Sequence, residues 1–136
     1  MKPYKQALSN NCFATCIACI LERDPSLFPN FCFASQNWRE FTNQWLAKYD
    51  LFYLDITLPG DLRDELVKFW GWHVISGEGP RGKRHSVVGY KGEIAHDPHP
   101  DGGGLLGTAE DWEFGFLIST KPEWPLRRGG KQCPVN

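Results

Sequence analysis

The chain has 136 residues, of which 41% are apolar, including 6 Trp and 9 Phe, and this suits one domain with a real hydrophobic core. A formal net charge of −1 without a basic stripe argues against a general nucleic-acid binder. The apolar run 13–21 follows two lysines, as in a secretory signal, but a charged segment and no small-residue cleavage site come after it. The run is also shorter than the roughly 20 residues of a membrane span. We therefore predict a cytoplasmic protein with no membrane partner.

The cysteine content fits that compartment. Five cysteines stand at positions 12, 16, 19, 32 and 133. In a reducing cytosol they stay as thiols, and their odd number argues against a closed disulfide framework.

The first predicted element is a short helix that begins at Cys12. Asn10 and Asn11 precede it and offer capping side chains. Residues 12–22 are apolar almost all round, which is typical of a buried helix. Prolines after this run end the helix and open a loop that extends to Asn37.

Two further helices and a strand follow in the first half. The second helix is amphipathic, with apolar residues at helical spacing: Trp38, Phe41, Trp45 and Leu46. Leu51 to Ile56 predicts a strand. Asp61 caps a third helix, which ends at Gly71. The apolar face of this third helix is predicted to be Leu62, Leu66, Phe69 and Trp70.

The second half of the chain changes to a β pattern. Runs rich in β-branched and aromatic residues predict strands at 72–76, 85–90, 93–97 and 112–119. Glycine-rich breaks at 77–82 and 102–107 separate them. Helices followed by an antiparallel sheet indicate an α+β fold. We assign residues 1–120 to this single domain and residues 121–136 to a poorly ordered tail.

Cys12 is a candidate nucleophile because it lies at the start of a predicted helix. Unpaired backbone N–H groups and the helix dipole at this end stabilise a thiolate. The same N–H groups can donate to an oxyanion that forms on an attacked carbonyl, and the amide of Gln6, six residues upstream, can reach the same point. Cys16 and Cys19 lie deeper in the helix, so we interpret them as structural core thiols.

His85 and Asp97 are a candidate base and its orienting carboxylate. If the two strands are joined by a three-residue loop at 90–92, His85 faces Asp97 directly, with Cβ atoms about 5 Å apart. That contact is the one that a catalytic base needs. A two-residue loop would instead place the two residues on opposite faces of the sheet.

Two segments resemble a known family. Gln6-Ala-Leu-Ser-Asn-Asn-Cys12, followed by Phe-Ala-Thr-Cys16, resembles the N-terminal signature of papain-fold cysteine peptidases. The nearest likeness is to the double-glycine leader peptidases of bacteriocin exporters, in which a Gln precedes the nucleophilic Cys by six residues. His85-Ser-Val-Val-Gly-Tyr and Ala95-His-Asp97-Pro98 resemble the second half of that family.

The resemblance implies a papain-like fold, in which an N-terminal helical half carries the Cys and a C-terminal antiparallel sheet carries the His and Asp. It implies a peptidase, isopeptidase or amidase that cleaves an amide bond through a Cys thioester. Cys12 would be the nucleophile, His85 the base, Asp97 its orienting residue and Gln6 an oxyanion donor. The substrate would be a peptide or protein bound in extended form, and no cofactor or metal would be required.

Other functions are compatible with the same residues. A papain-like domain can become a catalytically silent peptide-binding module, although such domains usually lose the nucleophile or the base. The thioester can also be resolved by an amine, which would make the protein an acyl transferase.

Two hypotheses of a metal centre have less support in the sequence than a cysteine hydrolase has. Cys12, Cys16 and Cys19 have the spacing of the cluster ligands in radical enzymes that use S-adenosylmethionine, but cluster ligands need a loop and this segment predicts a helix. His96 and His99 could contribute to a zinc site, but the sequence lacks the His-x-x-x-His spacing of structural zinc sites.

Overall fold

The computed structural model describes residues 1–57 and 59–121. Within them the fold is α+β, as predicted. The helices are α1 (Cys12–Leu21), α2 (Phe31–Ala34), α3 (Trp38–Leu46) and α4 (Gly60–Lys68). The strands are β1 (Leu51–Ile56), β2 (Trp72–Glu78), β3 (Arg84–Tyr90), β4 (Glu93–His96) and β5 (Glu113–Ser119). Except for residue 121, the predicted tail 121–136 lies outside the described residues.

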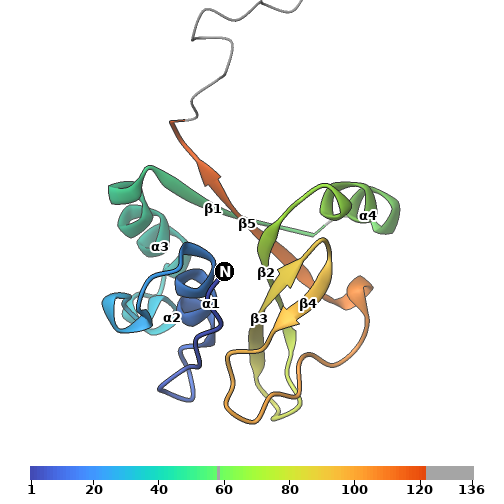
Figure 1. Ribbon diagram of the computed structural model, residues 1–136, viewed down its shortest axis with the longest axis horizontal. Helices are drawn as coiled ribbons and strands as arrows, with labels where there is room; N and C mark the ends of the chain where they lie inside the picture. The colour runs from blue at the N-terminus through green and yellow to red at the C-terminus, as the bar shows by residue number, and fades with distance from the viewer. Residues whose placement is uncertain (58, 122–136) are drawn as a thin grey trace, which may run out of the picture.

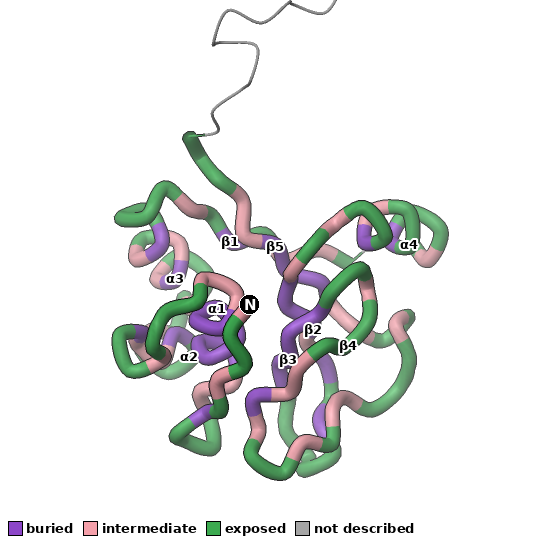
Figure 2. The backbone as a smooth tube through the Cα atoms, in the orientation of Figure 1, coloured by how far each residue is buried: buried purple, intermediate pink, exposed green. Residues whose placement is uncertain are grey.

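The five strands form one antiparallel sheet in the order β1-β5-β2-β3-β4. Helices α1, α2 and α3 gather on one side of it, and α4 lies apart from them (Figure 1). Neighbouring residues of β2 contribute to different clusters: Val74 packs with α1, whereas Ile75 packs with Val67 of α4. The sheet is therefore covered on both faces, and its central strands β2 and β3 are largely buried (Figure 2).

Helix α1 is the central helix of the fold. All of its residues from Phe13 to Cys19 are buried, and it packs against β2 and β3. The predicted side-chain cap is wrong, however, because Asn11 occupies the N-cap position without capping the helix. Its side chain instead accepts a hydrogen bond from the backbone N–H of Leu8 at 3.3 Å. Its backbone (φ −111°, ψ 29°) also departs from the extended conformation that a capping side chain uses.

The predicted loop between the first two helices contains a helix that sequence reasoning missed. Helix α2 has only four residues, and Phe31 at its start is fully buried. The Phe31 ring packs edge-on against Phe13 and Trp45, with centroids 6.0 and 5.4 Å away. Burial of this one ring fixes the turn, which no sequence periodicity could indicate in so short a segment.

Helix α4 differs from its prediction both in its bounds and in which of its residues face the core. Pro59 rather than Asp61 is the N-cap residue, and the helix ends before Gly71. Two residues of the predicted apolar face, Leu62 and Phe69, are 57% and 80% exposed. The other two, Leu66 and Trp70, do pack against the core.

A buried arginine stands in place of part of the predicted apolar face of α4. Arg63 is buried to 7% exposure, and its guanidinium lies 3.1 Å from Glu110 in the turn before β5. Arg63 and Val67 are the buried residues of the helix, whereas Leu62 lies in solvent. A pattern based on hydrophobicity alone places an arginine outside, so it could not include Arg63 in the buried face.

No helix within residues 1–57 and 59–121 combines the length and apolar character that crossing a membrane requires.

His73 on β2 is a buried titratable group that should make stability depend on pH. It is fully buried, its Nδ1–H donates to the carbonyl of Gly71 at 2.8 Å, and its Nε2 has no hydrogen-bond partner among the described residues. Gly89 leaves room for the ring, since a Cβ there would lie 2.6 Å from Nε2. Burial lowers the pKa of His73, although the hydrogen bond to Gly71 opposes the shift.

Below about pH 6.5, unfolded chains therefore take up a proton that the folded protein resists, and stability falls as the pH falls. We expect His73→Leu to remove this part of the pH dependence, as measured by urea unfolding at a series of pH values. An unchanged slope in the variant would show that His73 does not titrate between the two states.

Candidate active site

The β3–β4 hairpin differs from the predicted register at its turn. Tyr90 pairs with Glu93, so the loop consists of two residues, Lys91 and Gly92. Both have positive φ, 51° and 84°, as in the turns that match the twist of short hairpins. The predicted three-residue loop is therefore wrong.

A β-bulge compensates for the shorter loop. Gly89 pairs with Ile94 and Val88 with His96, which leaves Ala95 without a partner. One extra residue on β4 restores the side-chain phase that the shorter loop removes. His85 and Asp97 consequently meet, with His85 Nε2 2.7 Å from Asp97 Oδ1. The predicted contact is present although its predicted register is not.

Asp97 is held by the loop that follows β4. Its Oδ1 also accepts the backbone N–H of His99, and its Oδ2 accepts that of Gly104, each at 2.8 Å. Burial acts to raise the pKa of Asp97, but the hydrogen bonds from His85, His99 and Gly104 outweigh it, and the net pKa is lowered. The carboxylate stays ionised and fixes the His85 ring through Nε2, which leaves Nδ1 for a second partner.

Cys12 lies beside His85 at the same cleft. It is the first residue of α1, and the His85 side chain and the backbone of Ser86 and Phe13 act to lower the pKa of its thiol. Burial acts to raise the pKa of Cys12, but these contacts prevail and the net pKa is lowered. They favour a thiolate at this position.

The pKa of His85 shifts in the opposite direction. Burial acts to lower its pKa, whereas hydrogen bonds and charge interactions with Cys12 and Asp97 raise it, and the net pKa is raised. A lowered thiol pKa beside a raised imidazole pKa favours the pair of thiolate and imidazolium. Cys12, His85 and Asp97 thus form a chain of neighbouring side chains, in which a hydrogen bond joins His85 to Asp97.

Gln6 lies close to this chain but outside the cleft that Cys12 faces. It is 5% exposed, its backbone N–H donates to Pro98, and its side-chain Nε2 donates to the Leu8 carbonyl at 2.8 Å. Its Oε1 is buried and has no hydrogen-bond partner within residues 1–57 and 59–121. One hydrogen of Nε2 remains unassigned, since the amide carries two.

The other described cysteines differ from Cys12. Cys16 and Cys19 are fully buried, and burial raises the pKa of each. Cys32 borders the same cleft, but partial burial and the nearby Cys12 raise its pKa to about 11. Cys12 alone among these four thiols has a lowered pKa.

The histidines of the zinc hypothesis have other partners. His96 Nε2 donates to the carbonyl of Tyr4 at 2.7 Å, and His99 Nδ1 accepts the N–H of Asp101 at 3.0 Å. In the part of the chain that the structure describes, no three His, Cys, Asp or Glu side chains gather as a metal site would need.

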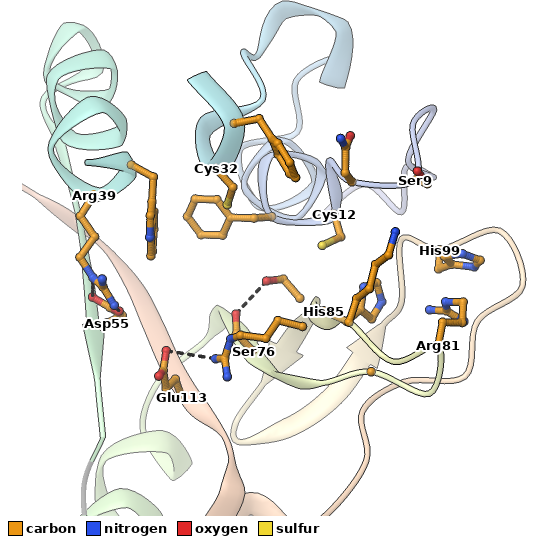
Figure 3. A pocket seen from close by; sticks show the side chains of 18 of the residues that line it. Ser9, Cys12, Cys32, Arg39, Asp55, Ser76, Arg81, His85, His99 and Glu113 are labelled. Atoms are coloured by element: carbon orange, nitrogen blue, oxygen red, sulfur yellow. Dashed lines mark hydrogen bonds and ion pairs between the residues drawn. The ribbon is translucent and has the colours of Figure 1, made fainter. Parts of the chain in front are cut away.

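Cys12 and His85 open into a cleft of about 720 Å³ between the helices and the sheet (Figure 3). This volume is in the range of small-molecule and peptide sites. The helical side contributes Ser9, Asn10, Cys12, Phe13, Cys32, Phe33, Trp38 and Arg39. The sheet side contributes Tyr53, Asp55, Ser76, Gly79, Arg81, Lys83, Arg84, His85, Ser86, His99 and Glu113.

Sequence analysis did not predict most of the residues that line the cleft. Asn10 could have been predicted, because it lies two residues before the candidate nucleophile. Asp55 and Glu113 could not, since only the pairing of β1 with β5 and of β5 with β2 brings them to the cleft.

Comparisons of the chain with protein-family models, with curated proteins and with solved structures found no match. The class that fold and site define is an α+β protein with a thiol, an imidazole and a carboxylate joined at a cleft.

The lowered pKa of Cys12 predicts selective alkylation. Iodoacetamide should label Cys12 before the other cysteines below about pH 7, because only thiolates react. His85→Ala should slow the labelling of Cys12 at that pH by about tenfold for each unit by which its pKa rises. Peptide mass spectrometry after timed labelling measures both. Uniformly slow labelling, or labelling of Cys32 first, would show that Cys12 is an inert thiol.

Proposed function

We propose that this protein is a papain-like cysteine hydrolase that cleaves an amide bond through a thioester on Cys12. The observation that carries the proposal is the Cys12 thiol beside the hydrogen-bonded pair His85–Asp97 at the edge of an open cleft. The order of these groups along the chain, with the thiol on a helix, the imidazole on β3 and the carboxylate directly after β4, supports the papain-like assignment. The presence of all three favours catalysis over a silent binding module.

The reaction divides into two steps. The Cys12 thiolate attacks the amide carbonyl, and the C–N bond breaks as the His85 imidazolium gives its proton to the leaving amine. A water molecule then gives a proton to His85 and attacks the thioester, which releases the carboxylic acid and restores the thiolate. Asp97 holds the His85 ring in position through both steps. An amine in place of water would give acyl transfer.

The oxyanion of each step needs donors near Cys12. The backbone N–H of Cys12, at the start of α1, is one donor in this proposal, and the remaining Nε2 hydrogen of Gln6 is the second. Asn10 is the competing side chain, because it borders the cleft and its Oδ1 is occupied by Asn30 at 3.0 Å, which leaves its NH₂ group to donate.

Substitution of the three chain members tests the proposal. Cys12→Ala and His85→Ala should each lower kcat/KM by about 10⁴-fold or more, and Asp97→Asn by about 10²-fold. A quenched-fluorescence peptide library provides the readout, and thermal unfolding checks that each variant is folded. Activity retained by folded Cys12→Ala or His85→Ala would refute the assignment.

A second pair of variants identifies the oxyanion donor. Gln6→Ala should lower kcat by about 10²-fold with little change in KM, because an oxyanion donor acts mainly in the transition state. Asn10→Ala should have a smaller effect on kcat. The reverse order would assign the role to Asn10.

A further inference from the structure

One wall of the cleft is aromatic. Phe13, Phe33 and Trp38 line it from the helical side, and Tyr53 lines it from β1. Phe13 packs edge-on against Trp38 and Tyr53, with ring centroids 5.3 and 5.0 Å away, so these rings hold one another in place. Phe33 is 69% exposed. A rigid aromatic wall with an exposed ring suits a large apolar side chain.

The opposite wall is cationic. Arg81 and Lys83 lie in the turn between β2 and β3, and Arg81 projects beside His99 near His85 (Figure 3). Two other cations of the cleft are neutralised: Arg39 by Asp55 at 2.6 Å and Arg84 by Glu113 at 3.5 Å. Arg81 and Lys83 have no carboxylate partner within residues 1–57 and 59–121. The cleft therefore has surplus positive charge, although the whole chain has a net charge of −1.

The loop that supports Asp97 also positions Arg81. Arg81 Nη1 donates to the carbonyl of Gly102 at 2.8 Å, and Gly104 donates to Asp97 in the same loop. The guanidinium is thus fixed relative to His85 and keeps further N–H groups for a ligand. Such preorganisation lowers the entropic cost of binding an anion.

From these two walls we infer the substrate class: a peptide segment that places an acidic side chain against Arg81 and Lys83 and a large apolar side chain against Phe33 and Trp38, on opposite sides of the scissile bond. This inference rests on the proposed function for the bond that is cut, but recognition itself is testable without cleavage.

Binding to the Cys12→Ala variant tests the charge preference first. Fluorescein-labelled peptides with Glu, Gln or Lys on one side of a central Gly, and Phe on the other, are compared by anisotropy in both orientations. We expect the Glu peptide to bind about 3- to 10-fold more tightly than the Gln peptide, and the Lys peptide to bind most weakly. The Glu advantage should shrink in high salt, which screens exposed charges.

Charge reversal of single lysines tests which residues cause the preference for the Glu peptide. The Lys83 side chain makes no hydrogen bond or ion pair to the described residues, so Lys83→Glu in the Cys12→Ala background is the cleaner variant. It should reduce or invert the ratio of affinities for the Glu and Lys peptides. Lys91→Glu, at the opposite end of β3 and outside the cleft lining, should leave the ratio unchanged. Phe33→Ala should remove the preference for Phe over Ala at the apolar position.

The outcomes separate the two proposals. Equal affinities for the Glu, Gln and Lys peptides, or no binding of any peptide, would overturn the inferred substrate class even if the wild-type protein hydrolyses amides. The expected order of affinities, without alkylation or turnover at Cys12 in the wild-type protein, would instead support recognition and refute the hydrolase.

Discussion

The packing of α1 against β2 and β3 is the constraint on which the rest of this structure depends. Because Phe13 to Cys19 are all buried, the helix cannot rotate or slide without exposing apolar surface. Its first residue is therefore fixed over β3, where the thiol of Cys12 meets the backbone of Ser86 and the ring of His85. The contact of α1 with β2 and β3 therefore has two effects. It stabilises the core, and it places the Cys12 thiol in the surroundings that lower its pKa.

The second organising group is the Asp97 carboxylate. It accepts hydrogen bonds from His85, His99 and Gly104, so it ties the strand, the loop after β4 and the imidazole together. The N-terminal segment packs on the same loop, with Lys5 Nζ donating to the carbonyls of Asp97 and His99. One partly buried charge with satisfied hydrogen bonds thus holds β3 and the loop after β4 together, because leaving it unpaired would be costly.

Prediction from sequence succeeded where local pattern and burial agree, and failed where a single distant contact decides. The strand at residues 51–56 and the helix at Trp38–Leu46 follow the predicted bounds, since their periodicity is clear. Half of the predicted apolar face of α4 is exposed instead, and the buried Arg63 bonds to Glu110, 47 positions away, a contact that local sequence does not indicate. The predicted loop of the β3–β4 hairpin is one residue too long, because the sequence does not predict the tight turn or the bulge at Ala95.

The sequence by itself determined the chemistry-bearing residues: a cysteine at a helix start, a histidine at the beginning of one strand and an aspartate at the end of the next. Residue type and local spacing suffice for those assignments. Only the tertiary structure decided which of them meet, which thiol has a lowered pKa, and which side chains line the cleft. Those properties depend on burial and on charges within a few ångströms, and strand order and register determine such neighbours across long stretches of chain.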